Sequence, residues 1–285
     1  MPFASSVPAL RLRWRAARAA AAASAAADPD EWNSTAGSWP HYSGADSDSV
    51  DTDQAASWSS DDSVVTASEP SVDMETWLVM EHCNRGCLRA ALQRGLFQSP
   101  GAGEGAPPCS DIAAVLATAA EIANAMAYLH AKHIVHGDLS CSNVLLTSST
   151  TAPHGFTAKI SDFGLSRELK TAAGLHTKTY GTVTHMPPEL LLDNKLTTAS
   201  DVFAYGVLLF ELACCRQAWE GMSHTQVLAA VTVDRRRLAF DPHVLPGIVE
   251  LSERCTAFDS AERPTFQECQ AVVAALRQSL PPALA

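Results

Sequence analysis

Apolar residues recur with helical spacing along four stretches of the chain. Between Asp111 and His130 they return about every 3.6 residues, and Asp111 is a suitable N-cap. The stretch from Ser200 to Cys214 is apolar almost all round, which predicts a helix at the centre of the core. Leu245 to Thr256 and Thr265 to Leu280 are the other two. The pattern therefore predicts a domain that is mainly helical.

Short apolar runs predict a few strands beside these helices. Trp77 to Met80 has the length and composition of a buried strand. Val144 to Leu146 and Phe156 to Ile160 are two further short runs that flank a turn. The predicted fold class is α+β, mainly α.

The first 73 residues differ in composition from the rest. Residues 1–27 carry four arginines, many alanines and no acid, as in an organelle transit peptide. The alanines at 19–23 show no amphipathic pattern, which favours the alternative, a low-complexity stretch without targeting function. Residues 28–73 are rich in Ser and Asp and poor in apolar residues, so we expect disorder. The predicted domain then covers residues 74–281, followed by a tail at 282–285.

Composition narrows the classes of partner. The 285-residue chain is 47% hydrophobic, enough for a sizeable core, and its net charge of -11 argues against nucleic acid or an anionic membrane as the main partner. It contains no uncharged apolar run of about 18 residues, so we expect no membrane span. Eight scattered cysteines without a Cys-x-x-Cys pair predict reduced thiols in an intracellular, cytoplasmic protein.

Two short polar motifs carry the candidate chemistry. His136 to Asn143 reads His-Gly-Asp-Leu-Ser-Cys-Ser-Asn, and Asp162 to Gly164 reads Asp-Phe-Gly. The strand predicted at 156–160 separates them. Together they resemble the protein-kinase signature, which implies a phosphoryl-transfer site in which one Asp orients a hydroxyl nucleophile while the Asn and the second Asp hold Mg²⁺ against a nucleotide's phosphates. The alternative, two unrelated turns, does not explain their order.

From Trp77 onward the chain resembles the C-terminal lobe of a eukaryotic protein kinase with the hinge that precedes it. The resemblance covers roughly 200 residues in the family's order. It implies that Asp138 accepts or orients the hydroxyl proton of a protein Ser or Thr. It also implies that Asn143 and Asp162 bind Mg²⁺ on ATP, with Phe163 packed beneath Asp162. His136 and Gly164 complete the two motifs.

The resemblance assigns further roles on either side of these motifs. The Glu81 carbonyl and the Cys83 amide would face adenine, Met80 would be the gatekeeper and Leu145 would form the floor under the base. A plain core strand is the alternative for the first three. At the end of the activation loop, the Thr182 hydroxyl would meet the catalytic Asp.

Three residues would have structural roles. Glu189 would form a buried ion pair with Arg263, and Asp201 would brace the backbone of the catalytic loop from the core helix.

The chain departs from the family pattern inside the motif. Gly137 replaces an Arg that in most kinases forms a charge-assisted pair with a phosphorylated activation loop. Control by phosphorylation through that contact should therefore be weak. Ser140 replaces a Lys that helps hold the γ-phosphate, which predicts a lower rate. The Gly-Asp-Leu-Ser form resembles tyrosine-kinase-like group kinases of green algae.

A larger departure lies before the hinge. No Gly-x-Gly-x-x-Gly occurs there, and the first Lys of the chain is Lys132, so the Gly-rich loop and the phosphate-anchoring Lys of the small lobe have no counterpart. One explanation is a fragment of a Ser/Thr kinase domain that lacks its small lobe, which the three intact site residues favour. The other is a pseudokinase-like interaction module.

Overall fold

The computed structural model describes residues 79–98, 111–169, 171, 174–177 and 181–281. The predictions for residues 1–73 and 282–285 lie outside the described residues. Seven helices are described: α2 (Leu88–Gln93), α3 (Ile112–Ala131), α4 (Pro188–Asp193), α5 (Thr198–Cys214), α6 (His224–Thr232), α7 (Pro246–Cys255) and α8 (Phe266–Gln278). Two 3-10 turns, η2 (Val183–His185) and η3 (Ser260–Glu262), lie between them.

The strands of the described residues form three small antiparallel pairs. The longest pair is β2 (Val144–Ser148) with β3 (Phe156–Ile160), in which Leu145 lies opposite Lys159. The other pairs join β1 (Ile134–Val135) to β4 (Arg167–Glu168) and β5 (Leu175–His176) to β6 (Lys195–Leu196). The predicted α+β, mainly α fold is confirmed.

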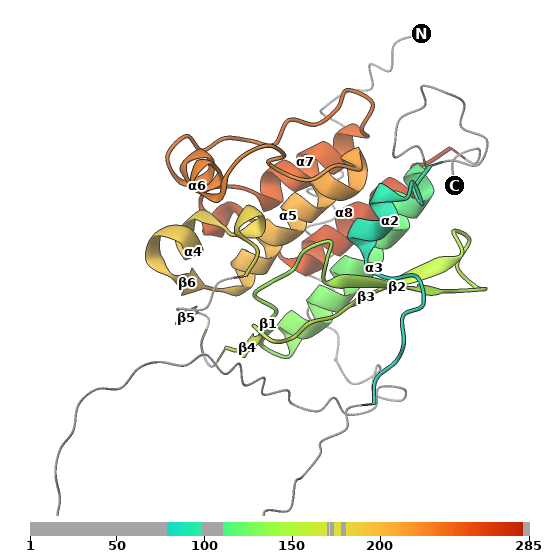
Figure 1. Cartoon of the computed structure of the whole chain (residues 1–285), viewed down its shortest axis with the longest axis horizontal. Helices are drawn as coiled ribbons and strands as arrows, with labels where there is room; N and C mark the ends of the chain where they lie inside the picture. The colour runs from blue at the N-terminus through green and yellow to red at the C-terminus, as the bar shows by residue number, and fades with distance from the viewer. Residues whose placement is uncertain (1–78, 99–110, 170, 172–173, 178–180, 282–285) are drawn as a thin grey trace, which may run out of the picture.

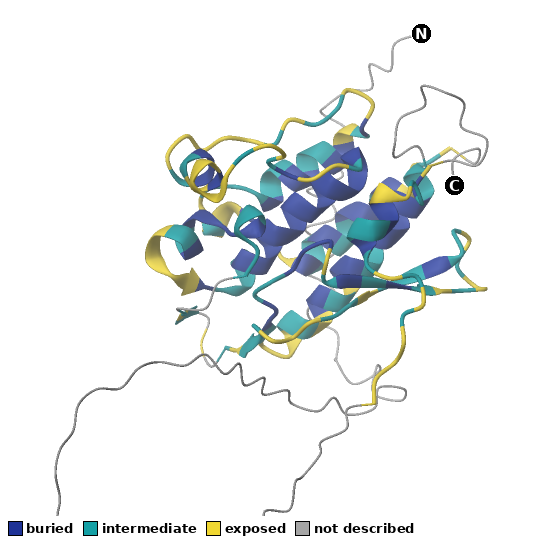
Figure 2. Cartoon of the chain, in the orientation of Figure 1, coloured by how far each residue is buried: buried dark blue, intermediate teal, exposed yellow. Residues whose placement is uncertain are grey.

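Helix α5 is the centre of the core, as its composition predicts. Figure 1 shows it between α7 and α3, and Figure 2 shows buried residues concentrated on these helices. The Tyr205 hydroxyl of α5 donates a hydrogen bond of 2.9 Å to the Ala119 carbonyl of α3. Burying this phenol and giving it a partner joins the two longest described helices.

The helix ends follow local chemistry. Asp111 Oδ1 accepts the N–H of Ala114 at 2.9 Å and caps α3, as predicted. Thr265 and Glu268 form a capping box at the start of α8. These caps satisfy backbone donors that an isolated helix end leaves without partners.

Helix α3 is long and apolar enough to cross a membrane by length and composition alone. In the structure it packs against α8 and β3, and over half of it is buried inside the protein. Glu121 on this helix accepts the backbone N–H of Ala158 at 2.7 Å, and burial raises the pKa of its carboxyl. These contacts explain its apolar composition as that of a core helix.

The strand predicted at Trp77 to Met80 is wrong for the residues that can be compared. Val79 and Met80 lie in irregular backbone with 95% and 81% of their surface exposed. Residues 77 and 78 lie outside the described residues. A strand needs a neighbour for its ladder of hydrogen bonds, and no described strand pairs with this segment.

Among the described residues the prediction of reduced thiols is correct for six cysteines and wrong for one, and the eighth, Cys109, lies outside them. Cys83, Cys87, Cys141, Cys214, Cys255 and Cys269 are free. Cys215 is disulfide-bonded.

The role of α5 in the core can be tested by truncating one fully buried side chain. Leu208→Ala should lower the free energy of unfolding by about 2–5 kcal/mol, because it removes apolar contacts and leaves a cavity. The matched control is Leu192→Ala, whose side chain is 57% exposed on α4 and whose loss should cost about 0.5 kcal/mol or less. Urea denaturation measures both values, and equal losses would contradict the assignment of α5 as the core.

Candidate active site

The backbone of the His136–Asn143 loop is held by one carboxylate from α5. Asp201 Oδ2 accepts the N–H of His136 and Oδ1 accepts the N–H of Gly137, each at 2.9 Å. His130 at the end of α3 places its Nε2 2.9 Å from the same Oδ2 atom. Asp201 is only 1% exposed, so these hydrogen bonds replace the water that the charge loses on burial. The bracing contact predicted for Asp201 is present.

The His136 side chain joins the two motifs. Its Nε2 lies 3.0 Å from the Ser161 carbonyl, which can only accept, so Nε2 carries the proton. Its Nδ1 is then free to accept the N–H of Asp138 at 3.3 Å. The ring also meets Phe163 edge to face, with centroids 5.3 Å apart. The buried imidazole therefore fixes the Asp-Phe-Gly turn against the catalytic loop.

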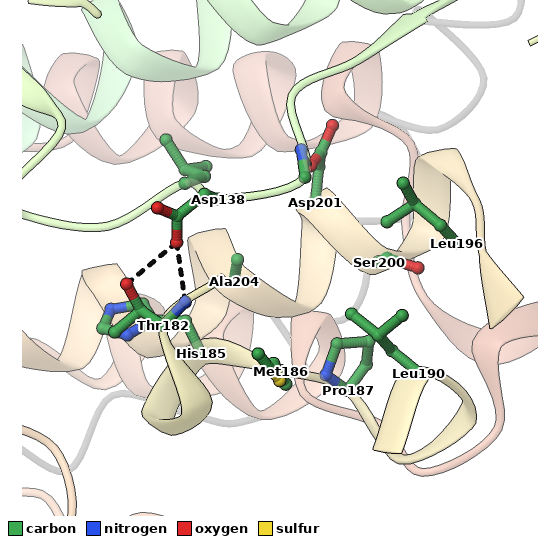
Figure 3. Close-up of a pocket in the computed structure, with 12 residues that line it drawn as sticks. Asp138, Thr182, His185, Met186, Pro187, Leu190, Leu196, Ser200, Asp201 and Ala204 are labelled. Atoms are coloured by element: carbon green, nitrogen blue, oxygen red, sulfur yellow. Dashed lines mark hydrogen bonds between the residues drawn. The ribbon is translucent and has the colours of Figure 1, made fainter. Parts of the chain in front are cut away.

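Both carboxylate oxygens of Asp138 accept hydrogen bonds. Thr182 donates its backbone N–H and its hydroxyl to Oδ1, each at 2.8 Å, and Figure 3 shows the two side chains facing one another. Asn143 Nδ2 donates to Oδ2 at 2.9 Å and to the Asp138 carbonyl at 2.8 Å. The predicted contact of Thr182 with Asp138 is present. It shows that a hydroxyl fits within hydrogen-bond reach of this carboxylate.

Asn143 and Asp162 have the donor atoms that Mg²⁺ prefers. The Asn143 amide nitrogen is used by Asp138, whereas its side-chain oxygen has no hydrogen bond to the described residues. Asp162 is exposed and has a left-handed backbone with φ of 62°, and its Oδ1 accepts the N–H of Gly164 at 3.2 Å. Such backbone strain concentrates at functional sites.

The oxygen atoms of Asn143 and Asp162 suit Mg²⁺ bound together with a nucleotide better than they suit a metal held by protein side chains alone. The described residues contain no group of three or more His, Cys, Asp and Glu side chains able to hold a metal. Mg²⁺ is commonly bound by one or two carboxylates together with substrate phosphates and water, so few protein ligands are needed. The roles of Asn143 and Asp162 stay predictions.

The small pocket beside Asp138 is not a nucleotide site. It lies between the catalytic loop, the η2 turn and α5, and its lining includes Leu139, His185, Met186 and Ala204 (Figure 3). Its volume of about 10 Å³ is room for about one water molecule.

The residues predicted to contact adenine lie around the β2–β3 pair. Met80 and Glu81 are exposed and Cys83 is half-buried. The Glu81 carboxylate makes two contacts of 2.7 Å with the Lys159 ammonium, on the strand opposite Leu145. The segment is thus tied to β3 by a side chain, while the backbone roles predicted for adenine stay predictions.

The ion pair predicted between Glu189 and Arg263 is present. Two parallel contacts of 2.7 Å join the guanidinium to the carboxylate, and the Arg263 side chain is fully buried. The same guanidinium donates to the carbonyls of Ala199 and Ala257 at 2.9 and 2.8 Å. This bidentate pair fixes the end of the activation segment to the C-terminal helices.

A buried polar cluster beside the catalytic loop was not predicted. Glu211 of α5 is 3% exposed and lies 3.7 Å from both His185 and Arg89. Burial lowers the pKa of His185, and the nearby Glu211 carboxylate opposes that shift. Burial and the same carboxylate raise the pKa of the Cys141 thiol. No sequence motif marks this cluster, because its members come from four separate segments.

The structure gives a physical reason for Gly137. Its φ is 79°, and an added Cβ would lie 3.0 Å from the Leu165 carbonyl oxygen. A side chain there would meet a rare backbone conformation and a tight backbone contact at once. The Arg that the resemblance to protein kinases leads us to expect at this position therefore does not fit this loop as it stands.

Comparison with known proteins matches the chain to one family of enzymes. Residues 59–273 match the family model described as protein tyrosine and serine/threonine kinase. The chain is 34% identical over 192 residues to the serine/threonine-protein kinase CTR1 of Arabidopsis thaliana, which covers 66% of this chain and 21% of that protein.

Two further relatives match comparable parts of the chain. The probable serine/threonine-protein kinase SIS8 of Arabidopsis thaliana is 37% identical over 166 residues, 57% of this chain and 15% of that protein. The protein sevenless of Drosophila melanogaster is 34% identical over 207 residues, 71% of this chain and 8% of that protein. The chain thus spans about a fifth or less of the length of these curated relatives.

The contribution of the buried Glu189–Arg263 ion pair to stability can be compared with that of an exposed ion pair. Arg263→Ala should lower the free energy of unfolding by about 3–5 kcal/mol, because it leaves the Glu189 carboxylate without its partner. The control is Arg237→Ala, which removes an exposed pair with Glu253 and should cost about 1 kcal/mol or less. Chemical denaturation measures both, and a loss for Arg263→Ala no larger than the control's would show that this contact does not anchor the segment.

Proposed function

Because the chain belongs to the protein tyrosine and serine/threonine kinase family, we propose that it carries the C-terminal lobe of a protein serine/threonine kinase domain, which transfers the γ-phosphate of ATP to a protein hydroxyl. The observation that supports this most is the pair of hydrogen bonds from Thr182 to Asp138. They place a Thr hydroxyl on the carboxylate proposed to receive the substrate hydroxyl. Two of the relatives are also named as serine/threonine kinases.

In the proposed reaction the substrate hydroxyl oxygen bonds to the γ-phosphorus while the bond to the ADP oxygen breaks. When bound with ATP, Mg²⁺ would neutralise the charge of the phosphates. Asp138 orients the hydroxyl through Oδ1 and takes up its proton. Asn143 and Asp162 would hold the cation, and the Asn143 amide keeps Asp138 in place. Catalysis of this kind depends mainly on positioning and charge stabilisation, which a fixed loop can provide.

The finer parts of the proposal concern what these 285 residues do not contain. We assign the Gly-rich loop and the phosphate-anchoring Lys to sequence beyond them, and we place the domain in the tyrosine-kinase-like group, of green-algal type, on the Gly137 to Ser140 form. An intracellular, cytoplasmic location is part of the same proposal. Protein substrates carrying Ser or Thr are the proposed partners.

A non-catalytic, pseudokinase-like interaction module is the second candidate. The observation that favours it is the absence of any Lys before Lys132 and of a Gly-x-Gly-x-x-Gly sequence before the hinge. Without these elements, nothing in the sequence clamps the phosphates from the small-lobe side. The two candidates differ in whether Mg-ATP binds and whether phosphate is transferred.

Transfer of radiolabelled phosphate from Mg-ATP to casein separates the candidates. The purified chain should show slow transfer to Ser or Thr, and Asp138→Asn should reduce it by about 100-fold or more, since a positioned base contributes about 10²–10⁴-fold. The control Asp193→Asn changes an exposed Asp at the end of α4 and should leave transfer unchanged.

Two results would contradict these expectations. No thermal shift with Mg-ATP together with no transfer would refute the kinase proposal for this chain and favour the interaction module. Transfer that survives Asp138→Asn would refute the role of Asp138.

A further inference from the structure

A second cavity lies away from the catalytic loop. It has a volume of about 260 Å³ and is bounded by α5, α7, Trp219 and the loop that follows α6, which Figure 1 draws in orange. It shares no lining residue with the pocket beside Asp138. Phe203 and Val207 of α5 form part of its apolar wall, with Phe258 beyond the end of α7. We call it the arginine groove, because Arg235, Arg236 and Arg237 line it in succession.

The groove contains a buried donor that nothing in the described structure uses. The indole N–H of Trp219 is inaccessible to water and has no acceptor among the described residues. A buried N–H without a partner costs free energy, about 1–3 kcal/mol, that a bound acceptor would recover. Trp219 also has a left-handed backbone, with φ of 60°, and so does Arg235, with φ of 48°. Left-handed backbone in such bulky side chains is uncommon and concentrates at binding sites.

The three arginines are placed differently. Arg235 stacks over the Phe258 ring at 4.0 Å, and Arg237 pairs with Glu253 at 3.0 Å with 73% of its side chain exposed. The Arg236 side chain is exposed and has no partner among the described residues. Glu253 and Glu262 also line the groove, so its lining carries three cations and two anions, a net charge of +1 in a chain whose net charge is -11. An acidic ligand would be drawn to this part of an otherwise acidic protein.

We propose that the arginine groove binds an acidic peptide segment of a protein partner, which inserts one apolar side chain between Phe203 and Phe258. The volume is below the range of about 300–1,000 Å³ typical of small-molecule sites, and it suits one anchoring side chain. Carboxylates beside the anchor pair with Arg236 and Arg237, and the Trp219 indole turns on binding so that a peptide carbonyl accepts its N–H. Nucleic acid suits the site less, because a strand of phosphates needs a run of free cations, whereas Arg237 is already paired with Glu253.

The proposal is independent of phosphoryl transfer, so the two fail separately. Asp138→Asn should bind the peptide as the unchanged chain does, whatever its effect on transfer. A groove that binds nothing would leave the kinase proposal intact.

A fluorescein-labelled peptide, Glu-Glu-Phe-Glu-Glu, tests the groove by fluorescence anisotropy. Changing both Arg236→Ala and Arg237→Ala should weaken binding about tenfold or more, because two charge-assisted contacts are lost. The control Arg277→Ala removes an exposed cation of α8 outside the groove and should change affinity by about twofold or less. Replacing the central Phe by Gly should weaken binding, as should added salt.

The Trp219 donor gives a test that needs no arginine variant. In a ¹⁵N NMR titration of the unchanged chain, the indole resonance absent from Trp219→Phe should move as the peptide saturates, and Trp219→Phe should bind about two- to tenfold more weakly. The proposal is overturned if Lys-Lys-Phe-Lys-Lys binds as tightly, if no saturable binding occurs, or if the Trp219 resonance stays fixed. Tighter binding of a single-stranded oligonucleotide would overturn it in favour of nucleic acid.

Discussion

The proposed catalytic geometry depends on the hydrogen bonds of the buried Asp201 carboxylate. It sits on α5, the central helix, and both of its oxygens accept backbone N–H groups of the catalytic loop. A charge so deeply buried is tolerated only when its hydrogen bonds are complete, and the third donor comes from His130 of α3. The loop that carries Asp138 is therefore positioned by the core itself. Any change that moves α5 moves the site.

Two further contacts fix the segments next to the catalytic loop. His136 connects it to the Asp-Phe-Gly turn through the Ser161 carbonyl, and Arg263 fixes the Glu189 end of the activation segment. The His136 and Arg263 side chains are both buried, and solvent screens hydrogen bonds and ion pairs least in the interior. The chain thus holds the side chains that are proposed to bind the metal and orient the nucleophile on one rigid support. The arginine groove is lined by other residues of α5, Phe203 and Val207, so that the proposed binding site and the pocket beside Asp138 share a helix but no lining residue.

Much of this arrangement follows from local patterns, and the rest depends on tertiary contacts. Periodicity was sufficient for α3, α5, α7 and α8, because each buries a long apolar face. The short α4 and α6 and the two-residue strands were missed, since few residues carry their pattern. The motifs and the resemblance located the Asp138–Thr182 and Glu189–Arg263 contacts. The cluster around Glu211 and the orphan N–H of Trp219 had no such signal, because burial by distant segments creates them. The strand expected near Met80 failed because apolar composition does not supply a pairing partner.

The central claim, that Asp201 holds the catalytic loop through backbone hydrogen bonds, is tested most directly by native-state amide hydrogen exchange. The amides of His136 and Gly137 should exchange as slowly as those of the α5 core, because the carboxylate releases them only when the core opens. Asp201→Asn should speed exchange at one or both amides, since the new NH₂ group cannot accept a hydrogen bond. Exchange at both amides as fast as in exposed loops of the unchanged protein would contradict the account.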